Sequence, residues 1–220
     1  MKRFSLRYTL LTYRLDQLWF PLAFWMLFVI IGLVRGPEYM LDTTRSYLGT
    51  VLPLIGGIMA AYAILDDPTL ELRFATPISA AQTLFERLGL LFLIQVISAL
   101  SFQVFAFLMN TDFSMFGSWG GVQLTWLVPT LSLMALGSLG ALSTAQTMAG
   151  ALLTGLVWIV ELIARGWFAG QKVGQYLLVF MGALMPSHPA LRANQLTLCL
   201  LAIAFFIISW VLFRRQERYI

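Results

Sequence analysis

Residues 196–213 read LTLCLLAIAFFIISWVLF, a run of 18 residues without one charged side chain. A helix of about 20 mostly apolar residues is long enough to cross the hydrocarbon core of a bilayer. In lipid, every backbone polar group must be satisfied internally, and a helix achieves this within one segment. Similar runs precede this one at residues 19–34, 47–65, 88–108, 122–143 and 147–164. The sequence therefore predicts an all-α integral membrane protein with six transmembrane helices.

The composition of the whole chain supports this interpretation. Of its 220 residues, 60% are apolar and 11% are charged, whereas a soluble domain carries roughly 25% charged residues. The apolar share is about 132 residues, and six spans of about 20 residues require about 120. We expect residues 1–220 to form a single transmembrane domain. The composition excludes a disordered chain, a secreted disulfide scaffold and a nucleic-acid-binding protein.

Few residues of the chain carry chemistry. There is one histidine, His188, and one cysteine, Cys199, so a disulfide framework and a cysteine or two-histidine metal site are excluded within one chain. The Gly-x-x-x-x-Gly-Lys-Ser/Thr loop that cradles phosphates is also missing from the sequence. We therefore expect no catalytic residue, no cofactor and no metal in this chain, and no enzymatic activity of its own.

Residues 1–18 are amphipathic and too highly charged for a cleavable signal peptide. Arg3, Arg7 and Arg14 fall on one stripe of a helical wheel, beside an apolar face. This pattern is typical of a helix that lies in the headgroup layer, so we expect an interfacial helix here. The alternative is a cytoplasmic extension of the first span, whose arginines only fix its orientation.

The distribution of basic residues predicts the orientation in the membrane. An even number of spans places both termini on one side. With the termini inside, the inner segments hold nine of the 14 basic residues and the outer segments hold five. Because Lys and Arg are enriched in cytoplasmic segments, we expect a multi-pass protein of the cell membrane with both termini in the cytoplasm.

The connection between the second and third spans has the features of ordered structure. Asp67 followed by Pro68 is a typical helix start, with a carboxylate to cap the helix and proline in its first turn. Pro77 ends this short helix at about Ala75, and Ser79 with Gln82 three residues later forms a predicted capping box for the next helix. The alternative is a plain surface loop.

The outer stretch 165–195 contains a second unusual segment. Residues 173–184, VGQYLLVFMGAL, are apolar but too short to span the membrane. Such a segment must return to the side from which it came, and non-helical backbone is tolerated at membrane depth only when it packs against protein or a cavity. We expect a re-entrant or surface-lying helical hairpin before the sixth span.

Glu161 is the only acidic residue inside a predicted span. An ionisable group in a membrane often belongs to a proton relay or a substrate contact. Arg165 follows four residues later, on the same face of a regular helix. The pair is therefore either a functional intramembrane polar site or a structural ion pair near the outer membrane surface.

Ser138 offers an enzymatic alternative. Residues 136–140, LGSLG, are similar to the membrane serine motif of rhomboid proteases, and His188 is the available base. However, Leu139 interrupts the Gly-x-Ser-Gly spacing, and the two side chains are expected about 20 Å or more apart in depth. We favour a helix-packing surface made of small residues, namely Ser132, Ala135, Gly137, Ser138, Gly140 and Ala141.

The whole layout resembles the permease subunits of type-2 ABC exporters. The most specific part of the resemblance is Glu71 followed by LRFAT, the turn Pro77-Ile78-Ser79, and Glu86-Arg87 at the next span. The resemblance implies that residues 68–76 form a cytoplasmic coupling helix that docks on a separate ATP-binding subunit, through Leu70, Glu71, Leu72, Arg73, Phe74 and Pro77.

The same resemblance implies the partners and the activity. Two permease chains, in a homodimer or heterodimer, would pair over two ATP-binding subunits, which hold the ATP and magnesium. The substrate would be a lipid, an amphipathic peptide or a hydrophobic drug, exported through a pathway in contact with membrane lipid. The rival hypothesis is a membrane scaffold or assembly factor without a transport role.

The predicted topology can be tested by cysteine accessibility. Single cysteines at Ser5, Asp112 and Glu217, introduced after replacement of Cys199 by serine, should react from different sides. We expect positions 5 and 217 to react with an impermeant maleimide only from the cytoplasm, and position 112 only from outside. Labelling of position 112 from the cytoplasm alone would contradict the six-span topology.

Overall fold

The computed structural model describes residues 16–65 and 80–214, and these residues form helices and connections without any strand. Six helical segments are long and apolar enough to cross a membrane, with mean hydropathies from 1.5 to 2.7. This is the layout of a multi-pass membrane protein, as predicted. The segments are α2 (Asp16–Arg35), a composite helix (Pro37–Leu65), α6 (Ala80–Leu108), α7 (Trp119–Thr144), α8 (Thr147–Gly170) and α11 (Leu191–Phe213).

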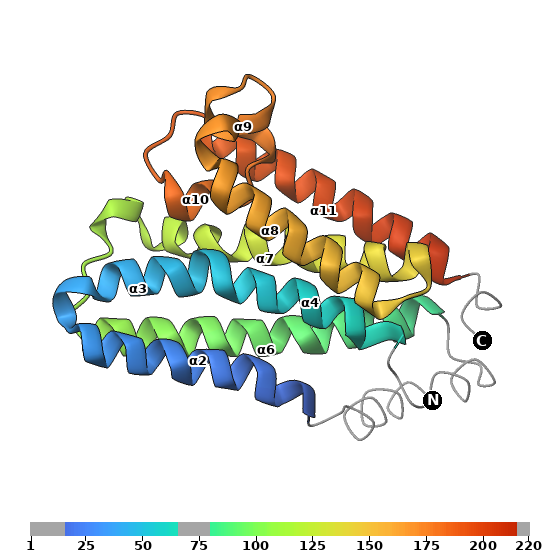
Figure 1. The fold of residues 1–220 in the computed structure, drawn as a ribbon, viewed down its shortest axis with the longest axis horizontal. Coiled ribbons are helices and arrows are strands. Elements are labelled where there is room, and N and C mark those ends of the chain that lie inside the picture. The colour runs from blue at the N-terminus through green and yellow to red at the C-terminus, as the bar shows by residue number, and fades with distance from the viewer. Residues whose placement is uncertain (1–15, 66–79, 215–220) are drawn as a thin grey trace.

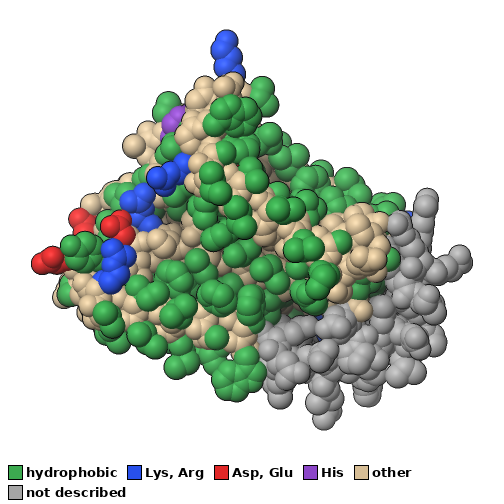
Figure 2. Space-filling view, in the orientation of Figure 1, with side chains coloured by type: hydrophobic (Ala, Val, Ile, Leu, Met, Phe, Trp, Pro, Cys, Tyr) green, Lys and Arg blue, Asp and Glu red, His purple; other side chains and the backbone are tan. Residues whose placement is uncertain are grey.

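The six segments run up and down along one bundle (Figure 1). We call the end that contains Asp16, Leu65 and Phe213 the terminal end of the bundle, and the end that contains Arg35 and Gly170 the hairpin end. Figure 2 shows that the acidic side chains visible on one face gather at the hairpin end, whereas hydrophobic side chains cover the middle of the bundle. An apolar middle with charges toward an end fits a bundle surrounded by lipid.

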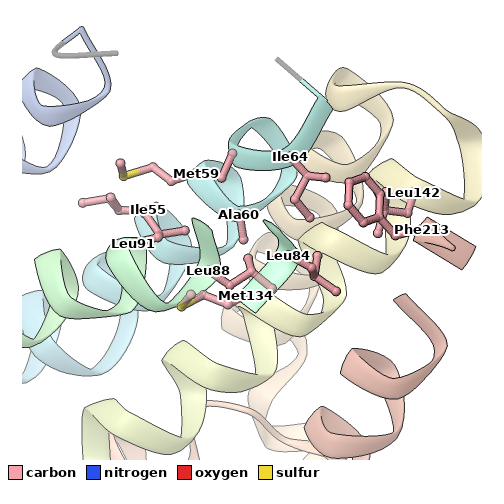
Figure 3. Packing of buried hydrophobic residues seen from close by; sticks show 11 residues of the cluster. Ile55, Met59, Ala60, Ile64, Leu84, Leu88, Leu91, Met134, Leu142 and Phe213 are labelled. Atoms are coloured by element: carbon pink, nitrogen blue, oxygen red, sulfur yellow. The ribbon is translucent and has the colours of Figure 1, made fainter. Parts of the chain in front are cut away.

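The composite helix and α7 form the centre of the bundle. In their most apolar windows, 72% and 67% of the residues are buried, against 11% in α2 and 17% in α8. At the terminal end of the centre, apolar side chains of α4 (Leu52–Leu65), α6 and α7 converge on one cluster (Figure 3). Ile55, Leu91 and Met134 are each at most 1% exposed there. The other helices therefore pack around α4 and α7 and leave apolar faces for lipid or another chain.

The predicted small-residue surface of α7 is confirmed as a packing surface. Ser132, Ala135, Gly137, Ser138, Gly140 and Ala141 are all buried. A Cβ atom on Gly150 of α8 would lie only 2.7 Å from the backbone nitrogen of Ala141, and one on Gly137 would collide with the carbonyl of Gly57 in α4. Small residues thus bring the backbones of α4, α7 and α8 into direct contact, as is usual in membrane bundles.

The composite helix contains a π-helical turn just before Pro53. It consists of η1 (Pro37–Tyr39), α3 (Met40–Ser46), the π-turn η2 (Tyr47–Val51) and α4. Pro53 has no N–H, and a proline ring collides with the carbonyl four residues earlier in a regular helix, here Gly49. The π-turn lies directly before Pro53, and the indole N–H of Trp158 in α8 donates to the carbonyl of Thr50 at 2.9 Å.

A tight turn joins α7 and α8. Helix α7 ends at Thr144, and α8 begins at Thr147. Ala145 adopts the left-handed conformation with a φ of 56°, and its N–H bonds to the carbonyl of Ala141. Two residues thus suffice to reverse the chain, which places α7 and α8 side by side.

Two predicted elements lie wholly or mostly outside the described residues. The predicted interfacial helix, residues 1–18, overlaps the described part only in its last residues, which begin α2. The predicted coupling helix, residues 68–76, lies entirely outside it. The described chain brings the two ends of the 66–79 connection, Leu65 and Ala80, to the terminal end of the bundle.

Replacing Gly150 by alanine should destabilise the bundle. The added methyl group would force α7 and α8 apart, at a cost of about 1–3 kcal/mol. Gly155 on the same helix is the control, because its added Cβ meets nothing within 4 Å. We expect Gly155→Ala to be neutral or to stabilise by roughly 0.5–1 kcal/mol. Unfolding by dodecyl sulfate titration measures both values, and equal stabilities would contradict the close packing.

Candidate functional site

The connection between α8 and α11 contains two single-turn helices, α9 (Gly174–Leu177) and α10 (Met181–Leu184). They pack at the hairpin end of the bundle (Figure 1), mainly against α7, α8 and α11. Leu178, Phe180 and Met181 are fully buried. Residues 173–184 do not span the bundle, as predicted, but they form two separate helical turns joined by a buried, non-helical link. We call residues 174–184 the hairpin segment.

Such short helices leave many backbone groups without a partner inside their own turn. In a buried segment, these groups need partners from elsewhere in the protein. Three polar side chains from three different helices supply them. They are Glu161 of α8, Asn194 of α11 and Arg45 of α3. These three side chains form the candidate functional site.

Glu161 holds the N-terminal side of α10. Its side chain is only 4% exposed. One carboxylate oxygen accepts a hydrogen bond of 2.7 Å from the backbone N–H of Val179, and the N–H of Phe180 also interacts with the carboxylate. Negative charge is favourable at a site where free N–H groups converge. The acidic residue therefore serves as a side-chain cap for a backbone turn that has no cap of its own.

Asn194 holds the C-terminal side of α9. It lies in the first turn of α11 and is 1% exposed. Its side-chain amide donates to the carbonyl oxygens of Gln175 and Leu178, at 2.9 and 3.0 Å. The two carbonyls belong to the last turn of α9 and the link that follows it. One amide thus ties the start of the sixth span to the hairpin segment.

Arg45 holds the C-terminal side of α10. Its guanidinium donates two hydrogen bonds to the carbonyl of Ala183, at 3.0 and 2.8 Å, and a longer one of 3.5 Å to that of Leu184. Gly49, one turn further along the composite helix, has no side chain to separate it from Ala183, because a Cβ there would overlap the Ala183 methyl group. The guanidinium also contacts the carboxylate of Asp42 at 3.6 Å.

The interpretation of Glu161 and Arg165 as a structural ion pair is wrong. Arg165 is exposed, whereas Glu161 is buried and accepts from the backbone N–H of Val179. The physical reason is a kink in α8. Ala164 has non-helical angles, φ −94° and ψ 15°, so residues 161 and 165 no longer share a helix face. The Glu161 side chain bonds to the hairpin segment, and Arg165 is exposed at the surface.

A groove of about 200 Å³ lies beside Glu161, between α7, α8 and α11, with the hairpin segment at one end. We call it the α8–α11 groove. Its lining residues are apolar except for Ser132 and Glu161. The lining residues are Ser132, Leu133, Leu136, Val157, Glu161, Leu177, Val179, Leu198, Leu201, Ala202 and Phe205.

A second polar feature, which the sequence analysis did not identify, lies on the buried face of α6. Gln103 is 2% exposed and exchanges hydrogen bonds with Gln123 of α7, the shorter one 2.7 Å long. Gln95 is fully buried, and its amide oxygen has no hydrogen-bond partner. Glutamine is uncharged and barely interrupts an apolar run. However, Gln95 and Gln103 lie eight residues apart on one predicted span, and this spacing was a detectable signal of a buried polar face.

Ser138 and His188 do not form a catalytic pair. The Ser138 hydroxyl is fully buried and donates to the carbonyl of Ala135 in its own helix at 3.0 Å. His188 lies in the connection before α11, where one ring nitrogen accepts from the N–H of Ala190. Ser138 is near the terminal end of α7, whereas His188 is at the opposite end of the bundle. Among the described residues, no three His, Cys, Asp or Glu side chains are grouped to hold a metal ion.

The residues proposed to couple to an ATP-binding subunit lie outside the described residues. They are Leu70, Glu71, Leu72, Arg73, Phe74 and Pro77. Comparison with known proteins adds no relative, because no family model, no curated protein and no solved structure matches the chain. The residues and their geometry therefore carry the functional inference.

Replacing Arg45 by methionine should loosen the hairpin segment. Methionine keeps an unbranched stem but leaves the carbonyls of Ala183 and Leu184 without their donor, and an unsatisfied buried group costs about 1–3 kcal/mol. Backbone amides of residues 178–185 should then exchange hydrogen at least about tenfold faster. Arg192→Met, which removes an exposed charge from α11, should leave the exchange unchanged. Equal exchange in the two variants would contradict the anchoring role.

Proposed function

We propose that this chain is the membrane-spanning permease subunit of an ATP-driven exporter of the type-2 ABC class. The observation that carries the proposal is the order of the elements. Two spans lead to a connection at the terminal end, three more spans follow, and a compact pair of short helices precedes the last span. The resemblance of residues 71–87 to the coupling region of these exporters supports the same assignment.

The arrangement of the spans suggests how movement would reach the substrate pathway. Residues 68–76 lie in the connection between α4 and α6, so a force on this segment acts on both helices. Helix α4 is central and touches α7 and α8 through glycine contacts that leave no free space. A displacement of α4 therefore has to move α7 and α8 with it. ATP and magnesium would be bound by the partner subunit, and this chain would carry out no covalent chemistry.

The remaining parts of the proposal follow from the charge distribution and from the exposed helix faces. Both termini would lie in the cytoplasm and the hairpin end outside the cell membrane, with transport directed outward. The mostly exposed apolar faces of α2, α8 and α11 would contact lipid and a second permease chain, identical or related. The substrate would be a lipid, an amphipathic peptide or a hydrophobic drug.

Phe74 provides the test of coupling. In the proposed coupling helix, Phe74 is the apolar anchor, because buried aromatic residues dominate interface energies. Phe74→Asp should insert and fold normally but lose its ATP-binding partner at least about tenfold in co-purification, or uncouple ATP hydrolysis from transport. Thr69→Asp is the matched control, since it adds the same charge to the first turn of the predicted helix, where a carboxylate is favourable.

The partner subunit can be identified first by pull-down with the parent chain. Transport and ATPase association by Phe74→Asp at the parent level would refute the coupling assignment. A stable parent chain that recruits no ATPase at all would instead support the scaffold hypothesis.

A further inference from the structure

We propose that the α8–α11 groove binds an amphiphile with a protonated amine head group, the amine on Glu161 and the alkyl chain along the groove. The site belongs to this chain alone. The proposal does not depend on whether the chain couples to an ATP-binding subunit. If the chain transports a substrate, the site would indicate the chemical class of that substrate.

The shape of the groove fits an alkyl chain. It runs between α8 and α11, two helices whose outer faces are mostly exposed, with α7 as its floor. Its lining on α11 extends from Leu198 to Phe205, which corresponds to about 10 Å along the helix. The lining is leucine, valine, alanine and phenylalanine apart from Ser132 and Glu161. Leu177 and Val179 of the hairpin region lie beside Glu161 at one end.

The position of Glu161 distinguishes this groove from a simple lipid crevice. Buried charges in proteins are normally paired, yet no basic side chain of the described chain lies within salt-bridge distance of this carboxylate. Arg165, the nearest basic residue in sequence, points away because of the kink at Ala164. The groove therefore carries an acidic group whose counter-ion the described protein does not supply.

The carboxylate has the capacity to bind one more donor. Two carboxylate oxygens offer about four acceptor positions. The N–H groups of Val179 and Phe180 use two of these positions, and Glu161 also lines the groove. A primary ammonium group has three donors and no acceptor, so it complements the remaining positions in both charge and hydrogen bonding. An anionic head group would be repelled, and a neutral alcohol would lack the charge.

Photo-crosslinking of the purified full chain in phosphatidylcholine nanodiscs tests this assignment. The probe is dodecylamine with a diazirine near the end of its alkyl chain. We expect crosslinks to map to residues 198–205 of α11 and 132–136 of α7. Unlabelled dodecylamine should compete at least about tenfold better than dodecanol or dodecyl sulfate, because only the amine pairs with the carboxylate.

Two variants separate head-group recognition from filling of the groove. Glu161→Gln keeps an oxygen for the N–H of Val179 but removes the charge, and should lower crosslinking at least about tenfold. Leu201→Trp leaves Glu161 intact but fills the groove, and should abolish it. Glu38→Gln removes an exposed acidic residue from η1 and should crosslink as the parent does.

Each result bears on the assignment. Amide exchange of residues 178–185 reports whether Glu161→Gln retains the hairpin segment. If Glu161→Gln loses the hairpin segment, the Leu201→Trp variant becomes the test. Crosslinking of Leu201→Trp at the parent level then contradicts the proposed site. If the segment is retained and Glu161→Gln still crosslinks fully, or if dodecanol competes as well as dodecylamine, the groove merely holds lipid tails and the assignment is wrong.

Discussion

The hairpin end of the bundle depends on hydrogen-bond partners for the backbone of a buried segment that contains only short helical turns. Long helices in lipid need no hydrogen-bond partners from other segments, because their backbone hydrogen bonds are internal. The short turns of the hairpin segment pair only part of their backbone groups internally, and three polar side chains supply further partners from outside. Glu161 accepts from its N–H groups, and Asn194 and Arg45 donate to its carbonyls. Since they come from α8, α11 and α3, the same bonds hold these three helices in position.

The other organising feature is the direct backbone contact among α4, α7 and α8. Within lipid there is little hydrophobic drive between helices, so close van der Waals packing has to supply the association. Gly57, Gly137 and Gly150 permit it. Close contacts at the centre and polar anchors at one end together hold α4 against its neighbours. In the proposed permease, a displacement of α4 at the terminal end would therefore be passed on to α7 and α8.

Glu161 connects the structural and the functional interpretation. The carboxylate accepts from the N–H of Val179 and interacts with that of Phe180, and so caps the turn of the hairpin segment. Glu161 also lines the apolar α8–α11 groove, where the proposed amine would supply a counter-ion. Structural capping and ligand binding can thus share one residue because they use different acceptor positions.

The sequence alone determined the six helices and the small-residue surface of α7. Each of these depends on local properties, namely the length of an apolar run, the absence of charge and the size of side chains. It did not determine the partner of Glu161. The expected pair with Arg165 assumed a regular helix, and the kink at Ala164 removed it. The partners of Asn194, Arg45 and Gln103 were likewise left undetermined, because the partner of a buried polar group depends on which helices lie side by side, and only the tertiary structure decides that.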